Sequence, residues 1–459
     1  MLLPFLEETT DTIPVTPVEP GDIPRYLDGL TPEARRWIEA TGFEADAGRV
    51  ALLPDAEGGL ARVLVGWQAT APLWALAGLP DALPARGYRL EGAPPEAATA
   101  LALGWALGGY EFTRYRERKK GWARLRWPEG ADRGRVERLA EGICLARDLI
   151  NTPTEDMGPA ELAAAAEALA GRHGARYRVI AGDALLAENY PTIHAVGRAA
   201  TTERAPRLID ITWGDPAAPK VTLVGKGVCF DTGGLDLKPA SGMRLMKKDM
   251  GGAATVLGLA HAVMAAGLKL RLRVLVPAVE NSVSGNAIRP MDIVTTRKGL
   301  TVEIGNTDAE GRLILCDALA EADSEKPALL IDFATLTGAA RTALGPDLPA
   351  LFANNDRLAE DFLAAGTEAA DPLWRLPLWP GYRPMYMSRI ADLNNVSESP
   401  FAGAIVAALY LQEFVSPATG WAHLDTYAWN QKPRPGRPEG GEALGLRAAY
   451  GLIAARFGG

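Results

Sequence analysis

The sequence predicts an α/β protein of two domains: a smaller N-terminal α/β domain, and a C-terminal domain with a largely parallel central sheet covered by helices. After about residue 150, short apolar runs alternate with segments of helical periodicity, as expected for strands buried on both faces. Before that point the chain is rich in Ala, Pro, Gly and Trp, with short apolar runs such as 63–67 between loops. We therefore expect domains at 1–150 and 151–459, with the linking helix in the first.

The individual elements follow from periodicity and from helix-breaking residues. Residues 132–149 carry apolar side chains at helical spacing, and Asn151-Thr152-Pro153-Thr154 ends that helix. A second helix is expected over 156–170, with Pro159 near its start. Further helices are expected at 252–266 and 313–322, and strands at 208–212, 221–224, 270–276 and 328–333. Functional side chains should gather at the carboxyl ends of these strands.

The composition argues against nucleic-acid and membrane partners. The chain is 48% hydrophobic and 23% charged, with a formal net charge of -8, and an acidic balance disfavours binding to phosphate backbones. Its start lacks the basic and apolar regions of a signal peptide, and no apolar run reaches the ~20 residues of a membrane helix. Three cysteines without CxxC spacing indicate a reducing compartment. We expect a cytoplasmic protein.

Histidine is too scarce for a zinc hydrolase of the HExxH type. The four histidines are far apart in the sequence, at His173, His194, His261 and His423. No HExxH pair occurs, so that class is excluded. Any metal has to be held by carboxylates and other groups.

Two segments concentrate charge where buried strands are expected to end. The first, residues 225–252, contains Asp231 and Asp249; the second, residues 306–313, contains Asp308 and Glu310. If the backbone of the second segment is extended, Asp308, Glu310 and Arg312 project to one face. Four carboxylates together are costly unless neutralised, and two divalent cations would balance them. Mn²⁺, Mg²⁺ and Zn²⁺ all accept such oxygen ligands.

The cations of these segments have separate interpretations. Lys226 follows a buried strand and could act as a neutral amine ligand beside two dications, because a buried lysine shifts its pKa readily. Lys238 and Arg312 are interpreted as charges facing a substrate, able to stabilise an oxyanion. Lys247 and Lys248 are expected to be solvated. Singly, each residue has a commonplace explanation as a turn aspartate, a surface lysine or a structural ion pair; their ordered combination favours a site.

This combination resembles the leucyl aminopeptidase family, also called cytosol aminopeptidases. The family's fingerprint octapeptide stands intact at Asn306-Thr307-Asp308-Ala309-Glu310-Gly311-Arg312-Leu313. The first segment also matches, at Gly225-Lys226-Gly227, Phe230-Asp231, Lys238-Pro239 and Asp249-Met250-Gly251-Gly252. Further similarity lies at Ala334-Thr335-Leu336-Thr337-Gly338 and Trp421-Ala422-His423-Leu424-Asp425. The resemblance covers roughly 150–430.

The resemblance implies a two-metal aminopeptidase with a role for each matching residue. The tighter metal would be held by Lys226, Asp231, Asp249 and Glu310. The more exchangeable metal would be held by Asp231, Asp308 and Glu310. The metals would be Mn²⁺ or Zn²⁺, with Mg²⁺ also admitted. Lys238 would support the oxyanion, and Arg312 would hold a bicarbonate ion acting as general base.

The resemblance also implies how substrate binds and how the chain assembles. The substrate pocket would be lined by Met246, Thr335, Leu336 and Gly338. The substrates would be peptides with a leucine-like N-terminal residue, and the family forms homohexamers. An assembly role is expected for the N-terminal domain.

Some residues depart from the family's usual pattern or keep simpler interpretations. Met291 replaces the usual glycine of Arg-Pro-Gly-Asp, and residues 426–430 replace an isoleucine-alanine-glycine run. These departures bear on substrate preference and assembly. His423 and Asp425 are expected to form a buried structural unit. Cys229 is assigned to packing, and Asn306 either orients a ligand or serves a turn.

Two other functions remain open on the sequence alone. Some members of the family bind DNA, which the acidic balance disfavours here; a salt-dependent gel shift tests this. A carboxylate-bridged phosphoesterase would share the two-metal chemistry, but a lysine ligand and the intact octapeptide disfavour it. Turnover of a phosphate ester but of no peptide would reverse that ranking.

Overall fold

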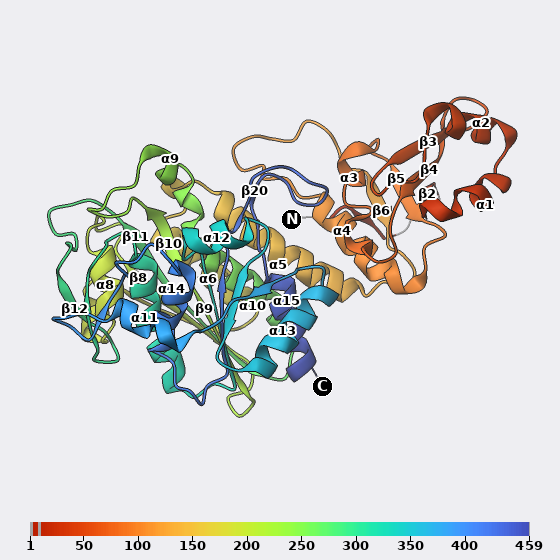
Figure 1. Cartoon of the computed structure of the whole chain (residues 1–459). Coiled ribbons are helices and arrows are strands. Elements are labelled where there is room, and N and C mark those ends of the chain that lie inside the picture. Colours follow the sequence, from red (N-terminus) through yellow and green to blue (C-terminus); the bar gives the residue numbers. More distant parts are fainter. Residues whose placement is uncertain (1–2, 8–10, 459) are drawn as a thin grey trace. The chain divides into compact units, whose positions relative to one another are not determined.

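The computed structural model describes residues 3–7 and 11–458, which form two compact units (Figure 1). Unit 1 comprises the chain as far as Cys144 together with Lys432–Glu439, and unit 2 comprises Leu145–Gln431 and Gly440–Gly459. The division falls inside helix α5 (Arg133–Asn151), and the later segment 432–439 belongs to the first unit. A single predicted domain boundary near residue 150 does not account for the assignment of residues 432–439 to unit 1.

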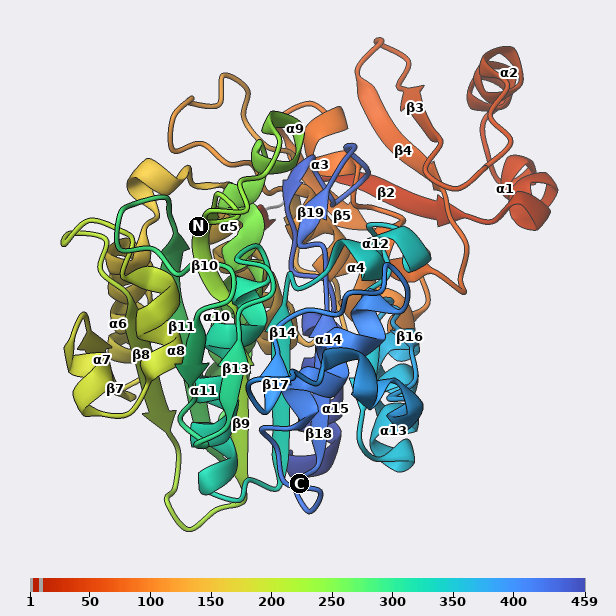
Figure 2. The same ribbon diagram turned by 60° about the vertical axis from the view of Figure 1, so that its left-hand side comes forward.

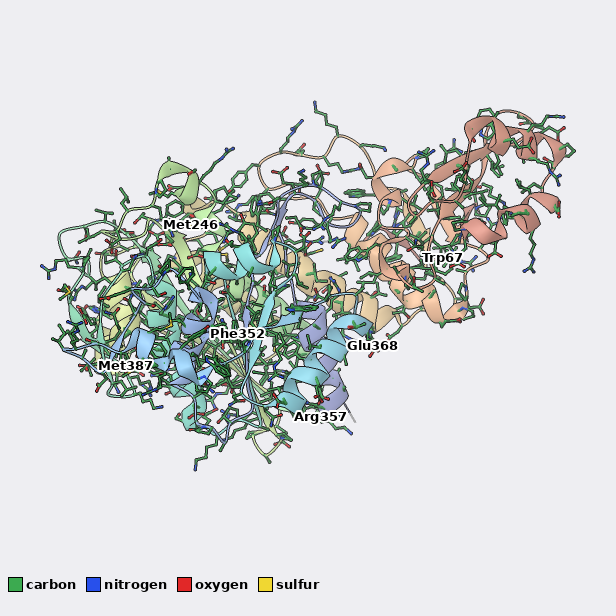
Figure 3. The ribbon with its side chains drawn as sticks, viewed as in Figure 1. Trp67, Met246, Phe352, Arg357, Glu368 and Met387 are labelled. Carbon is green, nitrogen blue, oxygen red and sulfur yellow. The ribbon has the colours of Figure 1, made fainter. Side chains whose placement is uncertain are left out.

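Unit 1 is built on a six-stranded sheet in the order β1-β6-β5-β2-β4-β3. All neighbouring strands are parallel except β3 and β4, which form an antiparallel pair. The strands are β1 (Phe5–Leu6), β2 (Ile13–Val18), β3 (Val50–Pro54), β4 (Leu60–Gly66), β5 (Gly87–Leu90) and β6 (Arg124–Arg126). The helices are α1 (Ile23–Asp28), α2 (Pro32–Thr41), α3 (Leu79–Ala82) and α4 (Ala98–Gly108). Trp67, labelled in Figure 3, follows β4 and is buried.

Unit 2 contains a nine-stranded sheet in the order β16-β15-β18-β14-β9-β11-β8-β7, with β10 also paired to β11. Its centre is parallel, because β18, β14, β9 and β11 run the same way. The strands are β7 (Arg176–Ala181), β8 (Arg207–Trp213), β9 (Lys220–Gly225), β10 (Gly227–Asp231), β11 (Arg271–Asn281), β14 (Leu329–Ala334), β15 (Ala350–Ala353), β16 (Trp374–Arg375) and β18 (Trp421–Asp425). The four predicted strands are thus present as β8, β9, β11 and β14, and the predicted two-domain α/β class is confirmed.

Helices cover both faces of this sheet (Figure 2). One group packs together as α8 (Pro191–Gly197), α11 (Glu310–Ser324) and α14 (Gly403–Gln412). The other group comprises α6 (Pro159–Arg172), α10 (Gly251–Ala265), α13 (Asp356–Glu368) and α15 (Leu446–Phe457). This two-sided cover explains why the central strands are continuous apolar runs: every residue of β14 is buried.

The remaining elements of unit 2 are short. They are the helices α7 (Ala184–Ala187), α9 (Ala240–Met243) and α12 (Gly338–Leu344), the strands β12 (Ile293–Thr295), β13 (Thr301–Glu303) and β17 (Leu393–Asn394), and the pair β19 (Trp429–Asn430) and β20 (Gly440–Gly441). Within the described ranges, no helix combines the length and the apolar character needed to cross a bilayer.

One expectation about the backbone is wrong. The octapeptide is not extended, because α11 begins at Glu310, three residues before the predicted start. Residues that are two positions apart in a helix project about 200° apart around its axis, so Glu310 and Arg312 do not share a face.

Candidate metal and substrate site

The predicted metal ligands meet at the carboxyl edge of the central strands and at the starts of two helices. Lys226 directly follows β9, and Asp231 is the last residue of β10. Asp249 lies in a 3-10 helix, Met246–Met250, that leads into α10. Glu310 is the first residue of α11, two residues after Asp308. Segments about 60 to 80 residues apart in the sequence are thereby joined, as parallel strand topology favours.

Lys226 lies at the centre of one half of the cluster. Its Nζ atom is 2.8 Å from Oδ2 of Asp249 and 3.0 Å from Oε1 of Glu310. It also donates a hydrogen bond of 2.9 Å to the carbonyl oxygen of Thr335. Burial by itself lowers the pKa of Lys226, but the neighbouring carboxylates, Asp249 foremost, outweigh burial and raise it. These carboxylates favour the protonated amine, and a metal ion bound to the same carboxylates would displace that proton and free the amine as a ligand.

Gly311 makes room for the Lys226 side chain. A Cβ atom at position 311 would lie 2.6 Å from Cε and 2.8 Å from Nζ of Lys226. Atoms do not approach this closely, so a side chain at 311 would displace the lysine. The glycine of the octapeptide is therefore a packing requirement of the site.

Lys238 bridges the carboxylates of the other half. Its Nζ atom is 2.8 Å from Oδ2 of Asp231 and also forms an ion pair with Asp308. Oδ1 of Asp231 accepts hydrogen bonds of 2.8 Å from Asn281 Nδ2 and from the backbone N–H of Gly233. Gly233 has φ +89°, a left-handed conformation that favours glycine. Sequence reasoning missed Asn281, which orients Asp231 from the end of β11.

The electrostatics of the cluster fit divalent cations. One oxygen atom from each of Asp231, Asp308 and Glu310 lies within 4.8 Å of the others. Burial and the charge of Asp231 raise the pKa of Asp308 to about 6 and that of Glu310 to about 8. Within the described residues, Oε2 of Glu310 is buried without a hydrogen-bond partner, and Oδ2 of Asp249 has only the Lys226 ammonium beside it. Carboxylate oxygens that are crowded and under-satisfied are a suitable donor set for hard cations.

A cavity of about 510 Å³ opens onto this cluster. Lys226, Asp231, Lys238, Asp249, Asp308 and Glu310 all line it. The four residues expected in the substrate pocket, Met246 (Figure 3), Thr335, Leu336 and Gly338, line the same cavity. Thr335 also donates a hydrogen bond of 2.7 Å to Oδ1 of Asp249, so one residue contacts both the pocket and the cluster.

Arg312 is placed differently from the other predicted residues. It is not one of the residues lining the cavity, and its guanidinium lies 6.0 Å from the ring centroid of Tyr410. Only 8% of Arg312 is exposed, and within residues 3–7 and 11–458 its Nε atom has no hydrogen-bond partner. Arg312 and Glu310 are two positions apart in α11 and therefore project from different sides of that helix.

The expectation that Lys247 and Lys248 are solvated is wrong. Lys248 is 5% exposed, lines the cavity, and lies 4.7 Å from the ring centroid of Tyr427. Burial lowers the pKa of Lys248 to about 8. Lys247 is partly buried and donates a hydrogen bond of 2.6 Å to the carbonyl oxygen of Asn151. Sequence reasoning had no signal for these contacts, because Tyr427 lies almost 180 residues further along the chain.

His423 and Asp425 are both buried on β18, but they serve different neighbours. His423 Nδ1 is 2.5 Å from Oδ1 of Asp332, beneath the ring of Phe352. Asp425 accepts hydrogen bonds from the backbone N–H groups of Leu336, at 3.0 Å, and Thr337, at 3.2 Å. The structural role is therefore correct for each residue, although they do not form one unit. Asp425 fixes the turn that lines the cavity.

The remaining doubtful residues take structural roles. Asn306 Oδ1 accepts a hydrogen bond of 2.7 Å from the backbone N–H of Asp308, which is a turn contact. Cys229 is buried, and burial raises the pKa of its thiol well above the usual value. The thiol is therefore a packing group.

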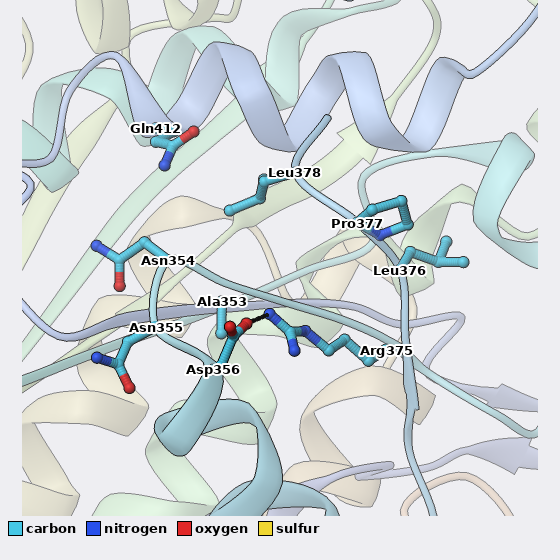
Figure 4. A pocket seen from close by; sticks show the side chains of 9 residues that line it. All are labelled: Ala353, Asn354, Asn355, Asp356, Arg375, Leu376, Pro377, Leu378 and Gln412. Atoms are coloured by element: carbon cyan, nitrogen blue, oxygen red, sulfur yellow. Dashed lines mark hydrogen bonds and ion pairs between the residues drawn. The ribbon is translucent and has the colours of Figure 1, made fainter. Parts of the chain in front are cut away.

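A larger cavity, of about 750 Å³, lies elsewhere in unit 2 (Figure 4). It is lined by residues 353–356, 375–378 and Gln412, and an ion pair between Arg375 and Asp356 crosses it. It lacks the carboxylate cluster, so its size does not make it the site of chemistry.

Comparisons with known proteins identify the family of this chain. The catalytic-domain model of the cytosol aminopeptidase family matches residues 144–450, and the M17 aminopeptidase N-terminal domain model matches residues 13–128. A probable cytosol aminopeptidase of Roseiflexus castenholzii is 41% identical over 375 residues, which are 78% of this chain and 76% of that protein. Peptidase B of Serratia proteamaculans is 41% identical over 363 residues, 76% of this chain and 84% of its own length.

Two solved structures share the whole fold. The cytosol aminopeptidase of Coxiella burnetii has a TM-score of 0.95 and 49% identity, with 98% of each chain covered. The bottromycin maturation enzyme BotP, solved in complex with Mn, has a TM-score of 0.87 and 35% identity, covering 97% of this chain and 99% of that one. The chain therefore belongs to the cytosol aminopeptidase family, whose members are metal-dependent hydrolases that act on peptides.

Proposed function

We propose that this chain releases N-terminal residues from peptides with two divalent cations bound at the carboxylate cluster. Lys226, Asp231, Asp249 and Glu310 would hold the tighter ion. Asp231, Asp308 and Glu310 would hold the more exchangeable one. The observation that carries the proposal is a cluster of four carboxylates brought together from three segments, in which Oε2 of Glu310 is buried without a hydrogen-bond partner among the described residues. Mn²⁺ and Zn²⁺ are the expected ions, and BotP was solved with Mn.

The bound ions would supply Lewis acidity and activate water for attack on a carbonyl. The chain's own residues position the substrate and balance the charge. Lys238 lines the cavity between Asp231 and Asp308, so its ammonium can stabilise negative charge developing on the carbonyl oxygen. Lys226 is held rigidly by three oxygen partners, which fixes the geometry of Asp249 and Glu310.

Arg312 is proposed to hold a bicarbonate ion, the general base implied by the resemblance. Its support is a buried guanidinium whose Nε atom has no hydrogen-bond partner in the described part of the chain, an arrangement that suits an anion. Activity in bicarbonate-free buffer should fall and recover when bicarbonate is added. An enzyme indifferent to bicarbonate would remove this part of the proposal.

The substrate preference, assembly and location are proposed on resemblance. An N-terminal leucine suits the apolar side chains of Met246 and Leu336 in the cavity. A homohexamer would show a mass six times that of one chain in sedimentation, with an assembly role for the N-terminal unit. A cytoplasmic location agrees with the names of the relatives.

Hydrolysis of leucine p-nitroanilide with Mn²⁺ tests the proposed function. Glu310→Ala and Lys238→Ala are expected to abolish turnover. Glu368→Ala and Lys269→Ala change the same residue types at exposed positions and should leave it intact. Full activity in both site variants would refute the mechanism.

A further inference from the structure

One wall of the metal-site cavity carries two cations that the proposed metal cluster does not use. Lys248 belongs to the 3-10 helix before α10, and Arg341 belongs to α12. Both line the cavity. Both also lie over the ring of Tyr427, with Lys248 Nζ at 4.7 Å and Arg341 Cζ at 5.0 Å from its centroid. Tyr427 lines the same cavity and thus links the two charges.

These cations differ from the other lysines of the site in forming no direct ion pair, although Asp249 and Asp425 lie near enough to interact with the charge of Lys248. Lys226 and Lys238 are each held by two carboxylates. Among residues 3–7 and 11–458, no carboxylate forms an ion pair with Lys248 or Arg341. Lys248 is nevertheless buried, with only 5% of its surface exposed, so its ammonium has lost most of its contact with water. An aromatic face compensates a buried ammonium in part, and an anion entering the cavity would complete the compensation.

The position of these cations points to the substrate as the source of that anion. They share the cavity with Met246 and Leu336, the residues proposed to contact the N-terminal side chain. The cavity therefore has an apolar wall and a cationic wall.

We propose that Lys248 and Arg341 bind a carboxylate of the peptide substrate, so that the enzyme favours peptides with a negative charge near the scissile bond. The inference rests on the proposed aminopeptidase function. The carboxylate has two possible sources: the side chain of an N-terminal Glu or Asp, and the C-terminus of a dipeptide. A guanidinium and an ammonium around one carboxylate give charge-assisted hydrogen bonds with either source.

The first arm of the test compares glutamate and leucine p-nitroanilides, which have no C-terminal carboxylate. The readout is the ratio of kcat/KM for the two substrates, because a general loss of activity cancels from it. Lys248→Met and Arg341→Gln are each expected to lower the glutamate-to-leucine ratio by about 10- to 100-fold, the effect of losing a hydrogen bond to a charged group. Lys247→Met is the matched control and should keep the ratio, since Lys247 does not line the cavity.

The second arm compares Leu-Leu with Leu-Leu amide. If the C-terminal carboxylate is the one bound, the same two substitutions lower the Leu-Leu to amide ratio and leave the first ratio unchanged. A change in either ratio supports the proposal and identifies the source. Arg341 is exposed, so Arg341→Gln keeps the test valid if Lys248→Met fails to fold.

The failures are distinguishable. An enzyme that hydrolyses leucine p-nitroanilide but shows neither ratio shifted in Lys248→Met and Arg341→Gln overturns this inference alone. A wild-type enzyme that hydrolyses none of these substrates overturns the proposed function and the inference with it.

Discussion

Gly311→Ala is a one-methyl test of how the metal site is packed. The added Cβ would lie 2.6 Å from Cε of Lys226. The end of a lysine chain is normally flexible, but this one is buried and has three oxygen partners: Asp249, Glu310 and the carbonyl of Thr335. The lysine therefore cannot yield to the methyl group without leaving at least one of them.

The expected cost follows from these contacts. Overpacking a well-filled interior costs about 1–3 kcal/mol of the free energy of unfolding. For a unit of this size, each kcal/mol lowers the Tm by roughly 2–4 °C, so the metal-free variant should melt about 2–12 °C below wild type. Because Lys226, Asp249 and Glu310 are proposed ligands of one ion, the affinity for Mn²⁺ should fall as well, by roughly 10- to 100-fold.

The assay pairs thermal melts of metal-free protein with calorimetric titration of Mn²⁺. Gly171→Ala is the matched control, because Gly171 also lies in a helix, α6, and an added Cβ there meets nothing within 4 Å. Alanine is the better helix former, so this control should lose no stability. Gly311→Ala with the Tm and the Mn²⁺ affinity of the control would refute the reasoning.

Three further measurements test the charges and the pocket of unit 2. Burial by itself raises the pKa of Glu442, but buried Arg147, 2.8 Å away, lowers it below the usual 4.5. The ionised Glu442 therefore stabilises the fold fully above about pH 4.5, and this contribution is lost as the pH falls through the lower folded-state pKa. Glu442→Gln should cost about 3–5 kcal/mol in urea melts at pH 7 and flatten that acid limb. Burial and Asp231 raise the pKa of Glu310 to about 8, so below that pH Mn²⁺ must displace a proton from this carboxyl group. Calorimetry in two buffers should therefore show weaker Mn²⁺ binding and more proton release as the pH falls from 8 to 6. An Mn²⁺ affinity that stays constant over this range would contradict the prediction. Asp425→Asn weakens the hydrogen bonds that residue 425 accepts from the backbone of the turn after β14. The substitution should raise KM for leucine p-nitroanilide about 3- to 10-fold, the cost of roughly one hydrogen bond, with less effect on kcat.

The sequence was sufficient where a local pattern determines local structure. The apolar run at 221–224 is β9, so the position of Lys226 at a strand end followed directly. The start of α11 was predicted less well. Ala309 provides no side-chain cap, and the apolar periodicity becomes visible only at Leu313, so the first helical turn carries Glu310 without a local signal.

Contacts between distant segments were beyond a reading of the sequence. Lysine is ordinarily a surface residue, and Lys248 is buried because Tyr427 packs against it at the start of α10. The segment 432–439 joins the first unit for the same reason: its contacts, not its composition, assign it. Tertiary packing overrides the ordinary preference of a lysine for solvent when an aromatic face receives its charge.

The octapeptide serves the site as a scaffold as much as a source of ligands. Thr307 Oγ1 donates a hydrogen bond of 2.6 Å to the carbonyl oxygen of Gly233 and accepts one of 2.8 Å from the backbone N–H of Asp236. These bonds tie the octapeptide to the loop between Asp231 and Lys238, while Gly311 makes room for Lys226. In the proposed metal site, Asp308 and Glu310 lie beside Asp231 because their neighbours in the octapeptide join the two segments. Substitutions at Thr307 or Gly311 should therefore weaken metal binding although neither residue carries a ligand.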